Sequence, residues 1–307
     1  MSKRKVVRIV AVVGVVVALA ALVASWVLAE IMLTGTRQTL DEAFAWQSEH
    51  YDTSFYDELA KVDYSVSGAE GYELHVQELA NPAPSSRYVI ISHGYTDNRM
   101  GALKYVPLYL ELGYNCIIYD LRGHGLNAST CTTYGVLEGQ DLACLVEDTR
   151  ARHPELTQLG LHGESLGAAS TISSLRFEPA IDFAVSDCAF SNIMGVLRKG
   201  YADVGAPAFL LDLANLGTGL RYHYSLTEMR PIEALAHNAV PVLYLHGAND
   251  QFIVPQNSQD LYDATVAAGT PAELHFIEGA GHAESVLVDP ASYKAYVSAF
   301  LQTLPKS

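Results

Sequence analysis

The sequence is poor in basic residues and in cysteines. Lys and Arg number 19 against 34 Asp and Glu, and the formal net charge is −15. Nucleic acids are bound through clustered Lys and Arg, so no nucleic-acid partner is expected. The cysteines are Cys116, Cys131, Cys144 and Cys188, and none forms the Cys-x-x-Cys pair of common zinc and redox sites. In an oxidising compartment, a disulfide between Cys131 and Cys144 stays an alternative to free thiols.

Charge is absent from a long stretch near the N-terminus. Ile9–Ala29 are 21 residues without a charged side chain, mostly Val, Ala and Leu. As a helix this stretch is about 30 Å long, the thickness of a bilayer core. Four basic residues precede it: Lys3, Arg4, Lys5 and Arg8. The positive-inside rule therefore predicts a cytoplasmic tail at 1–8, a single-pass transmembrane anchor at 9–29 and an extracytoplasmic remainder, in the cell membrane.

Two alternatives to a permanent anchor stay open. The apolar region of a secretory signal is shorter, about 7–15 residues, but "ALVAS" at 21–25 supplies small residues of the kind that precede a cleavage site. No cysteine follows the apolar run closely, which argues against a lipoprotein. The other alternative is a buried hydrophobic helix, which the length, the flanks and the terminal position disfavour.

Repeats are also absent, and the remaining chain alternates strands with helices. Residues 30–60 predict a linker or juxtamembrane helix. From residue 61 to 305, apolar runs such as "RYVIISHG", "NCIIYDLRGHG" and "VPVLYLHGAND" end in glycine and are separated by helical stretches. Such runs are typical of strands that are buried on both faces. The pattern predicts an α/β fold, with a mostly parallel central sheet and helices on both faces.

A segment at about 190–236 interrupts this alternation. It is too long for a simple connection and has apolar content of its own. We interpret it as a short helical cap inserted between two strands, at the carboxyl edge of the sheet. The alternative is an ordinary crossover helix with long flanks.

The stretch "LGLHGESLGAAS" places a serine where a predicted strand turns into a helix. Gly163 and Gly167 have no Cβ, so they relieve the crowding of a tight turn around Glu164 and Ser165. The turn would present the Ser165 hydroxyl at a helix N-terminus, where developing negative charge is stabilised. Gly-x-Ser-x-Gly between a strand and a helix is the pattern of a nucleophile elbow, so Ser165 is the predicted nucleophile.

A serine hydroxyl needs a base and an acid beside it. His282 lies in "IEGAGHAES", between the last predicted strand and the last helix, and is the predicted base. Asp250 ends the preceding strand and is the predicted acid, with Asp187 as its rival. Nucleophile, acid and base thus follow one another along the chain as Ser165, Asp250 and His282, which is the order found in α/β folds with a nucleophile elbow. The histidines of the four His-Gly pairs, His93, His124, His162 and His246, are expected to be structural, as is Asp120.

The oxyanion of a tetrahedral intermediate needs two hydrogen-bond donors. The backbone N–H of Leu166 directly follows the nucleophile and is the predicted first donor. The second donor is expected in the loop after "VIISHG", and we assign it to the backbone N–H of Tyr95.

The motifs "SHGYTDN", "YDLRGHG", "GESLGA", "HGANDQFIVP" and "GAGHAES" resemble those of serine hydrolases with the α/β-hydrolase fold, and the resemblance covers about 61–305. Within that superfamily the chain is similar to membrane-anchored or secreted bacterial relatives of serine aminopeptidases and monoacylglycerol lipases. The resemblance implies acyl transfer to water without a metal or organic cofactor. Esters, of lipids or small acyl groups, are the first expected substrates. A peptidase is the alternative, and a non-catalytic binding protein is a more distant one.

Overall fold

The computed structural model describes residues 2–305, which form two compact units. The first unit comprises the chain up to Gly35 together with Met194–Glu228. The second comprises Thr36–Ile193 and the chain from Met229 onward.

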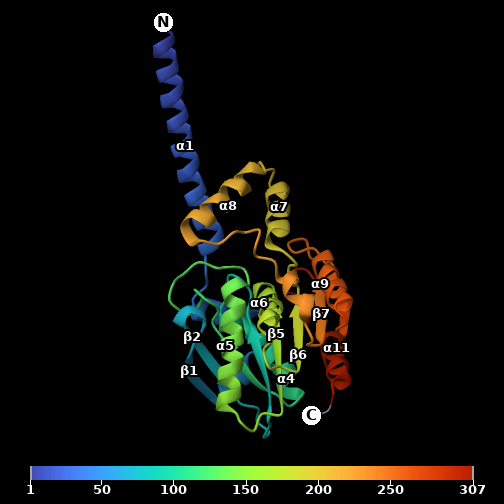
Figure 1. Ribbon diagram of the computed structural model, residues 1–307. Helices are drawn as coiled ribbons and strands as arrows, with labels where there is room; N and C mark the ends of the chain where they lie inside the picture. The colour runs from blue at the N-terminus through green and yellow to red at the C-terminus, as the bar shows by residue number, and fades with distance from the viewer. Residues whose placement is uncertain (1, 306–307) are drawn as a thin grey trace. The chain divides into compact units, whose positions relative to one another are not determined.

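The second unit is built on an eight-stranded sheet (Figure 1). Its strands are β1 (Lys61–Ser67), β2 (Glu73–Leu79), β3 (Arg87–Ser92), β4 (Asn115–Tyr119), β5 (Gln158–Glu164), β6 (Phe183–Asp187), β7 (Val242–Gly247) and β8 (Ala272–Ile277). Their order is β1-β2-β4-β3-β5-β6-β7-β8. The β1–β2 and β2–β4 pairs are antiparallel, and all other pairs are parallel. The mostly parallel sheet predicted from the apolar runs is confirmed.

The register of the parallel strands brings their carboxyl ends to one edge. Ser92 of β3 pairs with Gly163 of β5, and Glu164 of β5 pairs with Asp187 of β6. Asp187 in turn pairs with Leu245 of β7. Loops that follow these strands therefore meet at this edge, where ligands bind in open α/β sheets.

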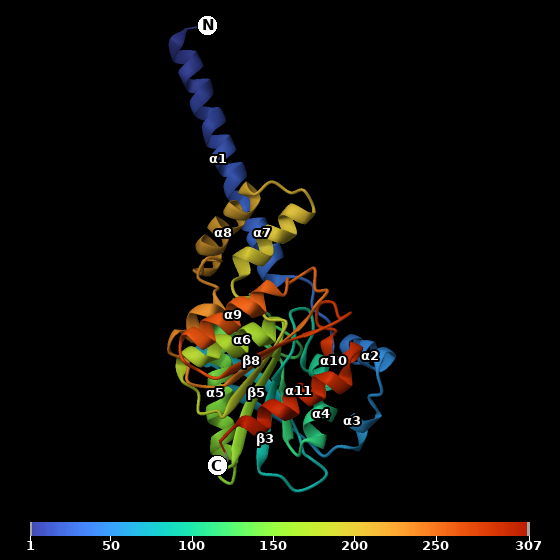
Figure 2. The same cartoon turned by 90° about the vertical axis from the view of Figure 1, so that its right-hand side faces the viewer.

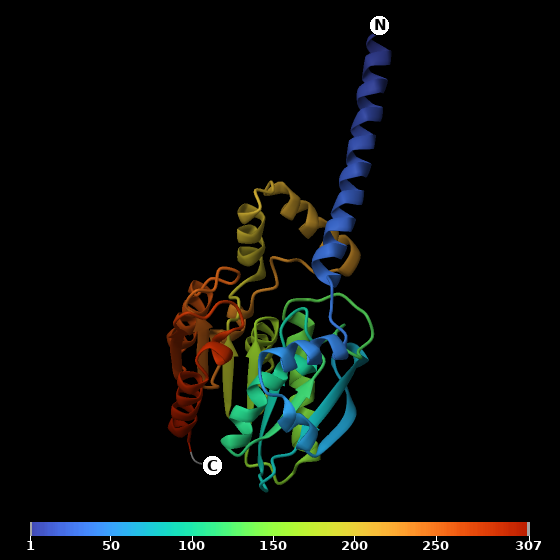
Figure 3. The same cartoon turned by 180° about the vertical axis from the view of Figure 1, so that it is seen from behind.

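Helices cover both faces of the sheet, as predicted. The helices of this unit are α2 (Leu40–His50), α3 (Ser54–Glu58), α4 (Val106–Glu111), α5 (Val136–Arg152), α6 (Leu166–Ser174), α9 (Gln256–Ala267), α10 (Ser285–Val288) and α11 (Pro290–Thr303), with 3-10 turns η1 (Ala69–Gly71), η2 (Arg99–Tyr105), η3 (Leu175–Phe177) and η4 (Pro231–His237). Figure 2 shows α4 and α11 on one face, and Figure 3 shows α4 and α2 from behind. The core on that face includes Ile91, Ile118, Val185 and Val297. On the other face, α6 and α9 pack on Ala184, Val242 and Tyr244.

The first unit contains three helices: α1 (Lys3–Thr34), α7 (Ile193–Asp203) and α8 (Phe209–Tyr222), of which α7 begins at the last residue of the second unit. Helix α1 is long and apolar enough to cross a membrane, by length and composition. Helices α7 and α8 make up the insertion between β6 and β7 that the sequence predicts to be helical.

All four cysteines are free thiols, including Cys131 and Cys144. Cys116, Cys131 and Cys188 are buried, whereas Cys144 is partly exposed.

Candidate active site

Ser165 lies at the sharp turn between β5 and α6. Its backbone has φ 53° and ψ −113°, a conformation that costs a non-glycine residue about 1–3 kcal/mol. The turn brings backbone segments so close that side chains are excluded on both sides. A Cβ at Gly163 would lie 2.5 Å from the Ala168 nitrogen, and one at Gly167 would lie 2.6 Å from the His93 carbonyl oxygen. Glycine is therefore required at both positions for this turn to form.

The structure brings His282 and Asp250 to this serine from two other loops. His282 lies in the loop after β8, and its Nε2 is 2.9 Å from the Ser165 Oγ. Asp250 lies in the turn after β7, and its Oδ2 is 2.7 Å from the His282 Nδ1. A carboxylate only accepts hydrogen bonds, so Nδ1–H donates to Asp250. In the neutral imidazole, Nε2 is then left to accept the Ser165 proton.

Asp250 is fully buried and held as a carboxylate by four donors. Its Oδ1 accepts the backbone N–H groups of Phe252 and Ile253, at 2.8 and 2.9 Å. Its Oδ2 accepts from His282 and, at 3.2 Å, from His246. Burial disfavours the charge, but hydrogen bonds and attraction from the two imidazoles outweigh it and hold the pKa of Asp250 below its usual range.

His246 belongs to this arrangement, although its sequence context gave no indication beyond a structural role. It is fully buried, and its Nε2 faces both Asp250 and the Ile253 carbonyl oxygen, at 2.7 Å from the latter. Since both neighbours are acceptors, Nε2 carries the proton, and Nδ1 accepts from the Ser258 hydroxyl at 2.6 Å. His246, four residues before Asp250, thus helps to hold the carboxylate in position for His282.

The loop after β3 lies against Ser165. A Cβ at Gly94 would be 3.8 Å from the Ser165 Cβ, so this backbone borders the Ser165 side chain. Tyr95 follows directly, and its ring stacks on Tyr134 at 5.7 Å between centroids. Leu166 is the first residue of α6, where backbone N–H groups have no partner within the helix. The two expected oxyanion donors therefore belong to segments that flank Ser165.

A buried ion pair stabilises the turn at Ser165. Glu164 forms an ion pair with Lys104, and both side chains are more than nine-tenths buried. Lys104 Nζ also donates to the Ala283 carbonyl oxygen at 3.0 Å. One cation thus joins the residue before Ser165 to the residue after His282. No sequence pattern indicates this role for Lys104, because its partners lie 60 and 179 positions further along the chain.

Asp187, the rival acid, is hydrogen-bonded to two tyrosines and not to the imidazole of His282. Its Oδ2 accepts from the hydroxyls of Tyr105 and Tyr293, at 3.1 and 3.0 Å. Its Oδ1 is buried without a hydrogen-bond partner. Burial, together with the nearby charge of Glu164, raises the pKa of Asp187 to about 6. The geometry therefore favours Asp250 over Asp187 as the partner of His282.

Three of the four His-Gly histidines make contacts within the scaffold. His93 accepts the Leu121 N–H at 2.9 Å, and His124 lies 2.8 Å from the Arg122 carbonyl oxygen. His162 is bound by the hydroxyls of two tyrosines, one of them that of Tyr109, at 2.9 Å. Burial lowers the pKa of His93 to about 4 and that of His162 to about 3, so both rings are neutral.

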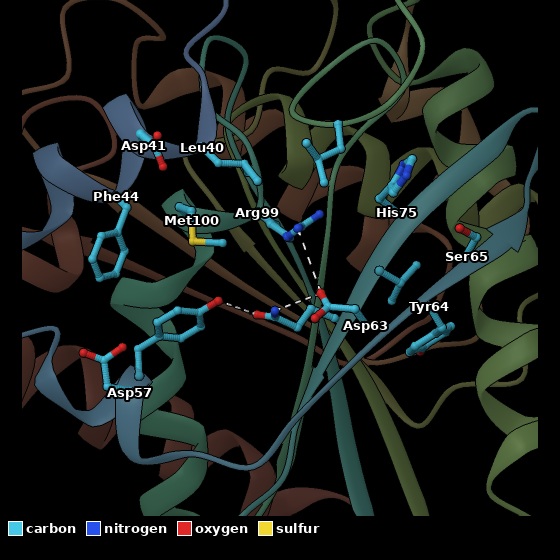
Figure 4. Close-up of a pocket in the computed structure, with 14 residues that line it drawn as sticks. Leu40, Asp41, Phe44, Asp57, Asp63, Tyr64, Ser65, His75, Arg99 and Met100 are labelled. Carbon is cyan, nitrogen blue, oxygen red and sulfur yellow. Dashed lines mark hydrogen bonds and ion pairs between the residues drawn. The ribbon is translucent and has the colours of Figure 1, made fainter.

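A groove of about 690 Å³ lies elsewhere, between α2, β1 and β2 (Figure 4). Ser165, Asp250 and His282 do not line it. Arg99 lies at the groove, between Asp63 and the buried Asp120. Asp120 also accepts the backbone N–H of Leu126, which matches the structural role expected for it. The charge of Arg99 is thus compensated by two carboxylates of the fold.

Comparisons with known proteins agree with this architecture. A sequence model of the alpha/beta hydrolase family matches residues 89–295. YqkD, an uncharacterized protein of Bacillus subtilis, is 30% identical over 258 residues, covering 82% of this chain and 83% of YqkD. The Pyrococcus furiosus esterase Pf2001 has a TM-score of 0.69 at 23% identity, over 82% of this chain and 94% of its own. The Pyrococcus horikoshii acylaminoacyl peptidase has a TM-score of 0.61 at 14% identity, over 81% and 42%.

The sheet order and the strand-to-helix turn after β5 define an α/β-hydrolase fold, which the two solved structures share. The match over residues 89–295 assigns the family: the chain belongs to the alpha/beta hydrolase family. The superfamily that the sequence motifs resemble is thereby confirmed.

Proposed function

We propose that this protein is a serine hydrolase that cleaves carboxylic esters through a covalent acyl-enzyme. One observation carries the proposal. The Ser165 Oγ, the His282 imidazole and the Asp250 carboxylate form a continuous chain of hydrogen bonds of 2.9 and 2.7 Å. In an α/β-hydrolase fold this is the arrangement that activates a serine for acyl transfer.

The proposed acylation step begins with proton transfer. As the Ser165 Oγ attacks the ester carbonyl carbon, its proton moves to the His282 Nε2. Asp250 keeps the imidazole in the required tautomer and stabilises the imidazolium. The backbone N–H groups of Tyr95 and Leu166 donate to the oxyanion of the tetrahedral intermediate. The intermediate then collapses, the C–O bond to the alcohol breaks, and the imidazolium gives its proton to the leaving oxygen.

Deacylation repeats these steps with water as the nucleophile. His282 takes a proton from the water, whose oxygen attacks the acyl carbon. The second tetrahedral intermediate releases the carboxylic acid, and the proton returns to Ser165. In each half-reaction His282 gives up the proton that it accepted, first to the alcohol and then to Ser165, so all three residues end as they began.

The state of Glu164 supports an esterase over an aminopeptidase. An aminopeptidase needs a free carboxylate to anchor the ammonium group of its substrate, and Glu164 is the carboxylate nearest to the nucleophile in sequence. Glu164 is buried, paired with Lys104, and accepts from the Tyr105 hydroxyl at 2.7 Å. Its charge is therefore compensated within the protein.

The location of the enzyme is part of the proposal. Helix α1 would cross the cell membrane with residues 1–8 in the cytoplasm, and the hydrolase unit would lie outside. The basic residues before the apolar run support this orientation. Protease added to intact cells should then digest the hydrolase unit, and protection of that unit would contradict the orientation.

The activity is tested with the full chain in detergent, on nitrophenyl esters of increasing acyl length and on aminoacyl nitroanilides. The wild type is expected to hydrolyse the esters, and Ser165→Ala or His282→Ala should lower kcat by about 10⁴-fold or more. Unchanged circular dichroism would show that the variants are folded. Faster cleavage of the anilides than of the esters would show that the protein is a peptidase and not an esterase. Ester turnover that survives Ser165→Ala would refute the assignment of the nucleophile.

A further inference from the structure

The insertion between β6 and β7 packs on the anchor helix. In the first unit, α8 runs beside the C-terminal part of α1 (Figures 1 and 3). The contact is made by small buried residues, Ser25 and Ala29 on α1 and Ala214, Gly217 and Thr218 on α8. A Cβ at Gly217 would overlap the Ser25 carbonyl group and lie 3.1 Å from the Ala29 Cβ. Glycine at position 217 therefore sets the close approach of the two helices.

Polar contacts hold the same two helices together one turn further along. Arg221 forms an ion pair with Glu30, and the Tyr222 hydroxyl donates to Glu30 at 2.6 Å. The Arg221 guanidinium also lies 4.6 Å from the centre of the Trp26 ring. A charge, a tyrosine and a tryptophan thus meet where the apolar run of α1 ends. This is the composition typical of a membrane boundary.

The length of the apolar run fixes the level of α8 once α1 crosses a membrane. A bilayer core takes about 20 helical residues, and the uncharged run of α1 is Ile9–Ala29. Ser25 and Ala29, which contact α8, are in its last two turns. Helix α8 is therefore held at the boundary of the bilayer that is distant from the basic N-terminus.

Helix α8 has a second apolar face, which is not used against α1. Phe209, Leu213, Leu216 and Leu220 follow one another at spacings of four, three and four residues, so they form one stripe along the helix. Phe209, Leu216 and Leu220 are 59%, 48% and 53% exposed. Val204, in the turn that precedes α8, is 79% exposed. An exposed apolar stripe of this size marks an interaction surface, and a membrane interface is one of the partners that such a surface suits.

The charge of the insertion suits the same partner. Residues 194–228 hold three basic and three acidic side chains, whereas the whole chain has a net charge of −15. The acidic surplus that would repel anionic lipid therefore lies outside the insertion.

We propose that the apolar stripe of α8 inserts into the lipid leaflet beside the anchor helix, as a second membrane contact of this protein. The partner is the bilayer itself, and α1 delivers α8 to it. The proposal depends on α1 crossing the membrane. It does not depend on the proposed esterase activity.

The test uses an environment-sensitive dye on the full chain in phosphatidylcholine vesicles with some phosphatidylglycerol. Leu216→Cys is labelled in a Cys144→Ser background, since the other three native thiols are buried. Val266→Cys is the matched control, because Val266 is also 48% exposed but lies on α9. The dye at position 216 should emit at shorter wavelength than the dye at 266. Lipids with a nitroxide on the acyl chain should quench the first dye and spare the second.

Further variants keep the result interpretable. Gly217→Leu should push α8 away from α1 and abolish the spectral shift at position 216, while circular dichroism stays unchanged. Labelling at Phe209→Cys should repeat the result for position 216. Equal emission and equal quenching at 216 and 266 would overturn the proposal. A shift that disappears when the protein is diluted in lipid would assign the stripe to a second copy of the chain and would overturn it as well.

Discussion

Replacing Asp250 by Asn is expected to disable the site through the tautomer of His282. The native carboxylate accepts two backbone N–H groups on Oδ1 and two imidazole N–H groups on Oδ2. An amide has only one oxygen. Keeping the turn intact requires that oxygen at the place of Oδ1, so the NH₂ group would face His282 and His246.

An NH₂ group cannot accept a hydrogen bond from His282 Nδ1. The imidazole would therefore place its proton on Nε2, where it donates to the Ser165 hydroxyl and can no longer take its proton. For a triad with the wrong tautomer, kcat is expected to fall by about 10⁴-fold, which corresponds to about 5.5 kcal/mol in activation free energy. The assay is hydrolysis of a short-chain nitrophenyl ester at saturating substrate.

Asp187→Asn is the matched control for this experiment. Asp187 is as deeply buried as Asp250, but its partners are the hydroxyls of Tyr105 and Tyr293. Its asparagine variant should keep kcat within a few-fold of the wild type. Activity that is retained in Asp250→Asn and lost in Asp187→Asn would refute the assignment of the acid.

The remaining predictions concern the supports of the site. Lys104→Met leaves the Glu164 carboxylate buried without its cation, and the free energy of unfolding in urea should fall by about 3–5 kcal/mol. The pKa of Asp187 is raised to about 6 in the fold, so its stabilising contribution is present below about pH 4 and is lost as the pH rises toward 6. In Asp187→Asn, the free energy of unfolding measured in urea should therefore change less between pH 4 and 6 than in the wild type. An equal pH dependence in the two proteins would show that Asp187 is not its source. Gly167→Val would press a side chain onto the Ser92 and His93 carbonyl groups, and both ester hydrolysis and the melting temperature should drop.

The elbow and the sheet could be predicted because their causes are local. Glycine on both sides of Ser165 and a buried run before it are signals within a few residues, and both match the observed β5–α6 turn. Asp250 and His282 could be placed near Ser165 because each lies in a loop after a predicted strand, and the carboxyl ends of parallel strands meet at one edge of the sheet.

Contacts between residues that are far apart in the sequence could not be predicted from local patterns. Lys104 gains its role from Glu164 and Ala283, and nothing near Lys104 in the sequence indicates either partner. His246 was one of four similar His-Gly pairs, and only the folded turn brings its Nε2 to Asp250. The packing of α8 on α1 joins segments about 190 residues apart, and the spacing of small residues on one helix does not indicate which other helix it meets.

The proposed mechanism requires Ser165 to be an activated nucleophile. The most direct test is labelling of the full chain by a fluorophosphonate probe, with wild type and Ser165→Ala side by side and the modified peptide identified by mass spectrometry. A phosphonyl adduct is expected on Ser165 in the wild type and none in the variant. A folded wild type that does not react, or an adduct that persists in Ser165→Ala, would contradict it.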